Sequence, residues 1–96
     1  MASAGPTLLV AEYVLSLENS LATTRQAEDR SLYQSLLADA AGLLAAAASG
    51  NAKSDLVVRI ERHERLWGQI WLQDPIYRTA QKLWFRAKEA LQNVAA

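Results

Sequence analysis

Apolar side chains recur at intervals of three and four residues along most of this chain, and this spacing constrains the fold more than any other feature. Near the N-terminus the pattern runs through Val10, Val14, Leu17 and Leu21. An α-helix places residues three and four apart on one face, so the spacing predicts a helix that buries one stripe. Four glycines and two prolines leave few points of interruption. We therefore predict an all-α protein.

Turn and capping residues divide this pattern into segments. Pro6 suits the first position of a helix, where a missing N–H needs no partner. Thr23 and Gln26 have the spacing of a capping box, which predicts a turn near residue 23, with one continuous helix as the alternative. Asp74 followed by Pro75 supplies an N-cap and a first helical residue, and therefore the sharpest boundary in the chain.

A second boundary is predicted between residues 49 and 55. The stop signal Ser49-Gly50-Asn51 precedes a short loop, after which Ser54 is expected to cap the next helix. We predict a flexible N-terminus over residues 1–6 and a single helical domain over 7–96. The expected fold is a small three- to four-helix bundle of antiparallel helices with a tight Asp-Pro junction between the last two, the helices being 7–22, 25–49, 55–73 and 75–94.

Composition and charge exclude several classes of protein. The chain has no cysteine, which excludes disulfides, thiolate catalysis and Cys-based metal sites. Its longest weakly polar stretch, 36–48, is shorter than the roughly 20 residues that a membrane span needs, which excludes a membrane anchor. No basic residue precedes the first apolar run, so we predict no secretory signal and a cytoplasmic location. The formal net charge is zero, with −3 on residues 1–50 and +3 on 51–96, whereas nucleic-acid-binding domains are usually clearly basic. Nucleic acid is therefore a disfavoured partner.

The aromatic residues are concentrated in the C-terminal half, where Trp67, Trp71, Tyr77, Trp84 and Phe85 occupy nineteen residues. At helical spacing the three tryptophans are interpreted as core residues. Phe85 is predicted to project away from the buried stripe of the last helix, among long cationic side chains. We therefore expect this half to carry any contact surface.

A partner-binding surface is predicted from side chains that lie off the apolar stripes. Leu66 and Leu72 are apolar positions expected at the surface, and Arg78, Lys82 and Arg86 form a basic ridge at four-residue spacing beside Phe85. The alternative is an ordinary solvated face with scattered apolar residues. The predicted partner-binding residues are Leu66, Leu72, Arg78, Lys82, Phe85 and Arg86.

His63 is the only histidine, and it is interpreted as a packing or hydrogen-bonding residue. Glu61 and Glu64 are its acidic neighbours, but zinc needs three or four ligands, so we predict neither a metal site nor a cofactor. Without a nucleophile beside His63, we also predict no enzymatic activity and no catalytic residue. Glu64 is expected at the rim of the bundle, or else paired with Arg25 or Arg30.

The order of several features resembles the FlaF family of flagellar biosynthesis regulators. The similar features, which span most of 12–91, are Arg25-Gln26-Ala27-Glu28, Leu32-Tyr33 with a long Ala/Leu helix, Ile60, Arg65, Leu66-Trp67, and a last helix containing Trp84. The resemblance implies a small, helical, non-enzymatic protein that acts in flagellin production and export.

Three functions remain open from the sequence. The preferred one is a non-catalytic binding module or export chaperone that offers an apolar groove to an amphipathic helix of another protein, flagellin being the most specific candidate. The alternative is a structural or assembly subunit that forms a homodimer or docks into a larger complex. A nucleic-acid-binding regulator is the third and least favoured.

Overall fold

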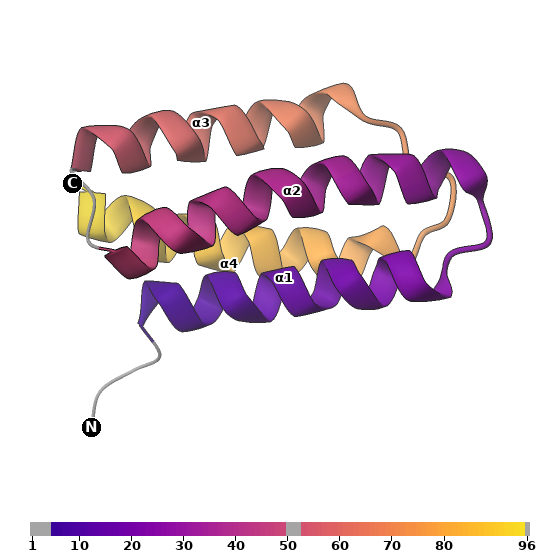
Figure 1. The fold of residues 1–96 in the computed structure, drawn as a ribbon, viewed down its shortest axis with the longest axis horizontal. Helices are drawn as coiled ribbons and strands as arrows, with labels where there is room; N and C mark the ends of the chain where they lie inside the picture. The colour runs from indigo at the N-terminus through magenta and orange to yellow at the C-terminus, as the bar shows by residue number, and fades with distance from the viewer. Residues whose placement is uncertain (1–4, 50–52, 96) are drawn as a thin grey trace.

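The computed structural model describes residues 5–49 and 53–95, and its regular secondary structure is entirely helical (Figure 1). In this part of the chain the elements are α1 (Pro6–Thr23), α2 (Ala27–Ser49), α3 (Lys53–Gln69) and α4 (Tyr77–Ala95). Each helix runs back along the preceding one, and α1 packs against both α2 and α4 while α3 closes the ring (Figure 1). The predicted small all-α bundle is confirmed.

The first helix begins where proline was expected to begin it. Gly5 is the N-cap, Pro6 is the first helical residue, and the Leu9 N–H donates to the Gly5 carbonyl at 3.2 Å. The predicted flexible segment therefore includes one residue that belongs to α1, and its residues 1–4 lie outside the described part of the chain.

The chain turns between α1 and α2 at residues 24–26, which confirms the predicted break, but the capping box is wrong. The Thr23 hydroxyl donates back to the Asn19 carbonyl at 2.9 Å and so closes α1. Thr24 instead accepts the Gln26 N–H through its hydroxyl, at 3.3 Å. The second helix then starts at Ala27, two residues later than predicted, because Thr24 and not Thr23 organises the turn.

The α3–α4 junction is longer than the predicted tight junction, since α3 ends at Gln69 and not near residue 73. The junction is held by Asp29 on α2, a fully buried residue whose carboxylate accepts the backbone N–H groups of Gln73 and Asp74 at 3.0 to 3.1 Å. Asp74 does cap the following turn, accepting the Ile76 N–H at 3.1 Å, but α4 begins at Tyr77. The amides of residues 73 and 74 are therefore bonded to a distant helix and not to α3.

The α2–α3 boundary agrees with the predicted stop at Ser49, although Gly50 and Asn51 lie outside the described residues. The third helix begins at Lys53, so Ser54 is a helical residue and not a cap.

The core combines the apolar stripes of the helices. Tyr13, Leu36, Ile60 and Trp84 are buried representatives of α1, α2, α3 and α4. Within the described residues no helix is long and apolar enough to cross a membrane.

Candidate functional site

A chain of hydrogen-bonded polar side chains crosses the middle of the bundle. His63 on α3 is fully buried, and its Nε2 lies 2.6 Å from the hydroxyl of Tyr13 on α1. Its Nδ1 lies 2.8 Å from Oδ2 of Asp39 on α2. The indole of Trp67 donates to the same Tyr13 hydroxyl at 2.8 Å, and Arg62 pairs with Oδ1 of Asp39 at 3.0 Å. This polar layer therefore joins α1, α2 and α3.

The donors and acceptors of the polar layer fit a neutral His63. The Asp39 carboxylate accepts from Nδ1–H, so Nε2 is free to accept the Tyr13 hydroxyl proton. In a protonated imidazole Nε2 would also carry a hydrogen and would act as a donor toward the Tyr13 hydroxyl. The hydroxyl hydrogen of Tyr13 would then have lost Nε2 as its acceptor. Burial lowers the pKa of His63, and the hydrogen bond to Asp39 acts in the opposite direction. Burial also raises the pKa of the Tyr13 phenol above its usual range.

The Asp39–His63–Tyr13 chain has the order of groups found in catalytic proton relays, but its surroundings differ. Tyr13 and His63 are both fully buried, and the Tyr13 oxygen already accepts from Trp67. A catalytic nucleophile needs a free position beside it for the substrate. The arrangement fixes the relative register of three helices, because a shift of one helix would leave buried polar groups without hydrogen-bond partners, at a high cost in free energy.

Glu64 lies at the rim of the bundle, as one of the two interpretations predicted. Its carboxylate pairs with Lys88 on α4 at 2.7 Å and lies 3.4 Å from the Trp84 indole nitrogen. The partners proposed from sequence, Arg25 and Arg30, are wrong: Arg30 donates to the Leu21 carbonyl, and the α4 lysine is nearer.

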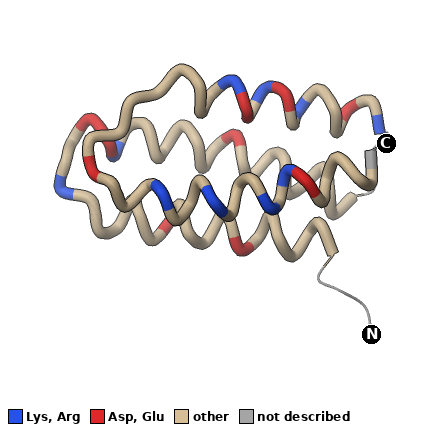
Figure 2. The backbone as a smooth tube through the Cα atoms, turned by 180° about the vertical axis from the view of Figure 1, so that it is seen from behind, with Lys and Arg blue, Asp and Glu red and all other residues tan. Residues whose placement is uncertain are grey.

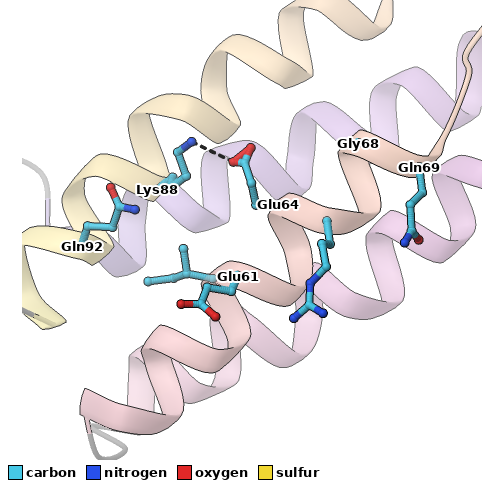
Figure 3. A pocket seen from close by; sticks show the side chains of 8 residues that line it. Glu61, Glu64, Gly68, Gln69, Lys88 and Gln92 are labelled. Atoms are coloured by element: carbon cyan, nitrogen blue, oxygen red, sulfur yellow. Dashed lines mark hydrogen bonds and ion pairs between the residues drawn. The ribbon is translucent and has the colours of Figure 1, made fainter.

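A groove follows the seam between α3 and α4 (Figure 3). Its larger cavity measures about 800 Å³ and is lined from α3 by Ile60, Glu61, Glu64 and Gly68, and from α4 by Lys88 and Gln92. The side chains of Glu61 and Gln92 point toward the space between the helices, and the Glu64–Lys88 pair bridges it (Figure 3).

A second cavity of about 270 Å³ adjoins the first at Gly68, which lines both. Trp71, Leu72 and Tyr77 contribute to its walls. We call the two cavities together the α3–α4 groove. Trp71 is 89% exposed, so the prediction that all three tryptophans are core residues is wrong for this one. Trp71 follows the end of α3 and therefore leaves the helical stripe that would have buried it.

The structure separates the predicted partner-binding residues into two groups. Phe85, Arg78, Lys82 and Arg86 are all exposed on α4. In a view from behind, Lys and Arg positions recur along this helix (Figure 2). Phe85 is 47% exposed, and Lys88 Nζ lies 5.1 Å above its ring.

Leu66 and Leu72 are only half-buried, and both pack against the core, so the expectation that they are surface positions is wrong. Leu72 still lines the α3–α4 groove, whereas Leu66 lines one cavity between α2 and α3 and a second cavity lined by α3 residues. Leu66 is therefore not brought together with the other predicted residues.

Trp71 and Gly68 are surface residues of the groove that the helical spacing did not indicate. The available signal was Asp74-Pro75, which marks a boundary, but nothing in the sequence placed the end of α3 before Trp71. Among residues 5–49 and 53–95 no group of three or more His, Asp or Glu side chains is arranged to hold a metal ion.

Comparisons of the chain with protein-family models, curated proteins and solved structures found no match.

Proposed function

We propose that this protein is a non-catalytic helical module that binds another protein through the α3–α4 groove and the adjoining surface of α4. The observation that carries the proposal is Trp71, whose indole is 89% exposed at the end of the groove. Tryptophan loses much apolar area from water when a partner covers it, and it is among the residues that contribute most to protein interfaces.

The neighbours of Trp71 support a contact surface larger than one side chain. Leu72 and Tyr77 share its cavity, and Gln81, one turn before the exposed Phe85, lines the same cavity. The surface therefore combines aromatic anchors with a hollow, as protein-recognition sites do.

The absence of catalysis is part of this proposal. The His63 ring nitrogens are both occupied by Tyr13 and Asp39 inside the core. The histidine is thus committed to holding helices together and not to proton transfer with a substrate.

Flagellin is the most specific candidate partner, and it rests on the resemblance to the FlaF family. The test is binding of purified flagellin, measured by calorimetry with the unmodified protein and two variants. Trp71→Ser is expected to weaken binding at least about tenfold, since it removes the principal anchor. Val58→Ser changes a residue of α3 that is 62% exposed and lines neither cavity of the groove, and it should bind as the unmodified protein does.

Equal affinity of Trp71→Ser and the unmodified protein for flagellin would show that the contact surface lies outside the groove. Failure of flagellin to bind any of the three proteins would remove flagellin handling.

A second candidate function, an assembly subunit, is favoured by an apolar strip on α1. Leu8 and Leu15 are seven residues apart on one face of the helix and are 53% and 60% exposed. Light scattering over a concentration series tests it: a mass that rises with concentration and is restored to the monomer by Leu15→Ser would favour self-association through α1.

A further inference from the structure

We propose that the groove binds an amphipathic helix whose flanks are acidic. This inference rests on the proposed function and specifies the chemistry of the partner. Three observations support it: the length of the groove, the open space at its centre, and the charge beside its aromatic anchors.

The groove has the length of a short helix. On α4 its lining runs from Tyr77 to Gln92. Fifteen helical steps cover about 22 Å, which corresponds to about four turns of a helix laid along the seam. Binding of an amphipathic helix in such a groove uses apolar anchors every three or four residues.

The centre of the groove can accept a side chain from a partner. A Cβ atom added to Gly68 would meet no heavy atom within 4 Å, so the surface there is open and free of side chain. Ile60 lies on one side of this point and Trp71 on the other, both lining the groove. The apolar residues of a docked helix would therefore contact Ile60, Gly68 and Trp71 in turn.

The positive charge beside the exposed Phe85 ring favours a partner helix with acidic flanks. Arg78 and Lys82 lie within about 60° of Phe85 around α4, so they border the exposed aromatic ring. In the described part of the chain neither makes an ion pair. On the opposite wall Glu64 is already paired with Lys88, and the charges of Glu61 and Arg65, which also line that wall, offset each other. Carboxylates on the partner would thus meet two cations that have no competing partner.

The same charges disfavour a second copy as the occupant. A two-fold axis that passes close to Phe85 would bring the Arg78 and Lys82 of both copies toward each other. Like charges placed together across an interface oppose association.

The experiment uses the whole protein and a synthetic helical peptide of about four turns, with leucine on one face and glutamate on both flanks. The readout is iodide quenching of tryptophan fluorescence, because Trp67 and Trp84 are buried and Trp71 is not. We expect the peptide to protect Trp71 from iodide. A matched peptide with lysine in place of every glutamate should give no protection.

Charge reversal on the protein supplies the second arm. Arg78→Glu with Lys82→Glu is expected to weaken binding of the acidic peptide at least about fivefold, and high salt should weaken it similarly. Arg25→Glu reverses an exposed charge in the α1–α2 turn and should leave binding unchanged. Equal protection by the acidic and lysine peptides would overturn the inference, as would protection that rises with protein concentration without peptide.

The peptide and flagellin arms distinguish the two proposals. Protection of Trp71 by flagellin, together with weaker flagellin binding by Trp71→Ser in calorimetry, but without protection by the acidic peptide would overturn the acidic-helix inference and retain the groove as a protein-binding site. Failure of both ligands to protect Trp71 would overturn both.

Discussion

The hydroxyl of Tyr13 on α1 and Nε2 of His63 on α3 lie 2.6 Å apart in the centre of the bundle. The two residues are fifty positions apart in the sequence, and both are fully buried. Trp67 donates to the same hydroxyl from the next turn of α3. The polar layer therefore makes α1 and α3 interdependent, and its removal provides a test of the fold.

Tyr13→Phe is expected to lower the free energy of unfolding by about 2 to 4 kcal/mol, because it leaves the Trp67 donor and the His63 acceptor buried without a partner. Urea denaturation measures the change. The matched control is Tyr33→Phe, since the buried Tyr33 hydroxyl is near Ser20 but makes no hydrogen bond of ordinary geometry among the described residues. That substitution should alter stability by less than about 1 kcal/mol. Equal losses in the two variants would contradict the polar layer.

Stability should fall as the pH drops below about 6.5, the ordinary pKa of histidine. Burial lowers the pKa of His63 in the folded state, so the unfolded chain binds the proton more readily. The contribution of neutral His63 is fully present above pH 6.5 and is lost as the pH falls, with a slope of at most about 1.4 kcal/mol per pH unit. Urea denaturation between about pH 7.5 and pH 5 measures it.

The surroundings of His63 define the control for this pH dependence. Asp39 on α2, Arg62 and Glu64 on α3, and Tyr13 on α1 are the titratable or charged groups that interact with it or with its partner carboxylate. His63 is the only histidine in the chain, so His63→Gln should flatten the profile over this range. A slope that persists in the variant would assign the pH dependence to other groups.

Asp29→Asn should destabilise the α3–α4 junction. The carboxylate accepts three hydrogen bonds from the backbone N–H groups of Gln73 and Asp74. In the asparagine variant one carboxylate oxygen is replaced by an NH2 group, a donor that cannot accept from these N–H groups. The expected loss is about 2 to 3 kcal/mol, and the two amides should exchange hydrogen faster. Glu12→Gln, at an exposed position of α1, is the control and should cost less than about 0.5 kcal/mol. Unchanged exchange in Asp29→Asn would contradict the role of Asp29 in holding the α3–α4 junction.

Trp67→Ala should lower stability strongly, whereas Trp71→Ala should leave it almost unchanged. Trp67 is 8% exposed and bonded to Tyr13, so its truncation is expected to cost about 3 to 5 kcal/mol. Trp71 is exposed, and its truncation should change stability by less than about 0.5 kcal/mol. Thermal unfolding of the two variants distinguishes them. A large loss in Trp71→Ala would show that this side chain supports the fold.

The sequence by itself determined the class of fold and most of the core. Apolar residues three and four apart can be buried together only on a helix face, so α1 and α2 followed from spacing alone, and Pro6 located the start of α1. The exposed basic ridge and Phe85 on α4 followed from the same geometry. These are local properties, because each depends on residues within a few turns of one helix.

Only the tertiary structure decided the partners of the buried polar groups and the exposure of Trp71. The contacts of His63 with Tyr13 and Asp39 join residues 50 and 24 positions apart, and local spacing carries no information about such pairs. Likewise, Asp29, from another helix, accepts the backbone amides of Gln73 and Asp74 in the segment that follows α3. The path of this segment, on which Trp71 is exposed, thus depends on a side chain of α2 that is more than forty positions away in the sequence.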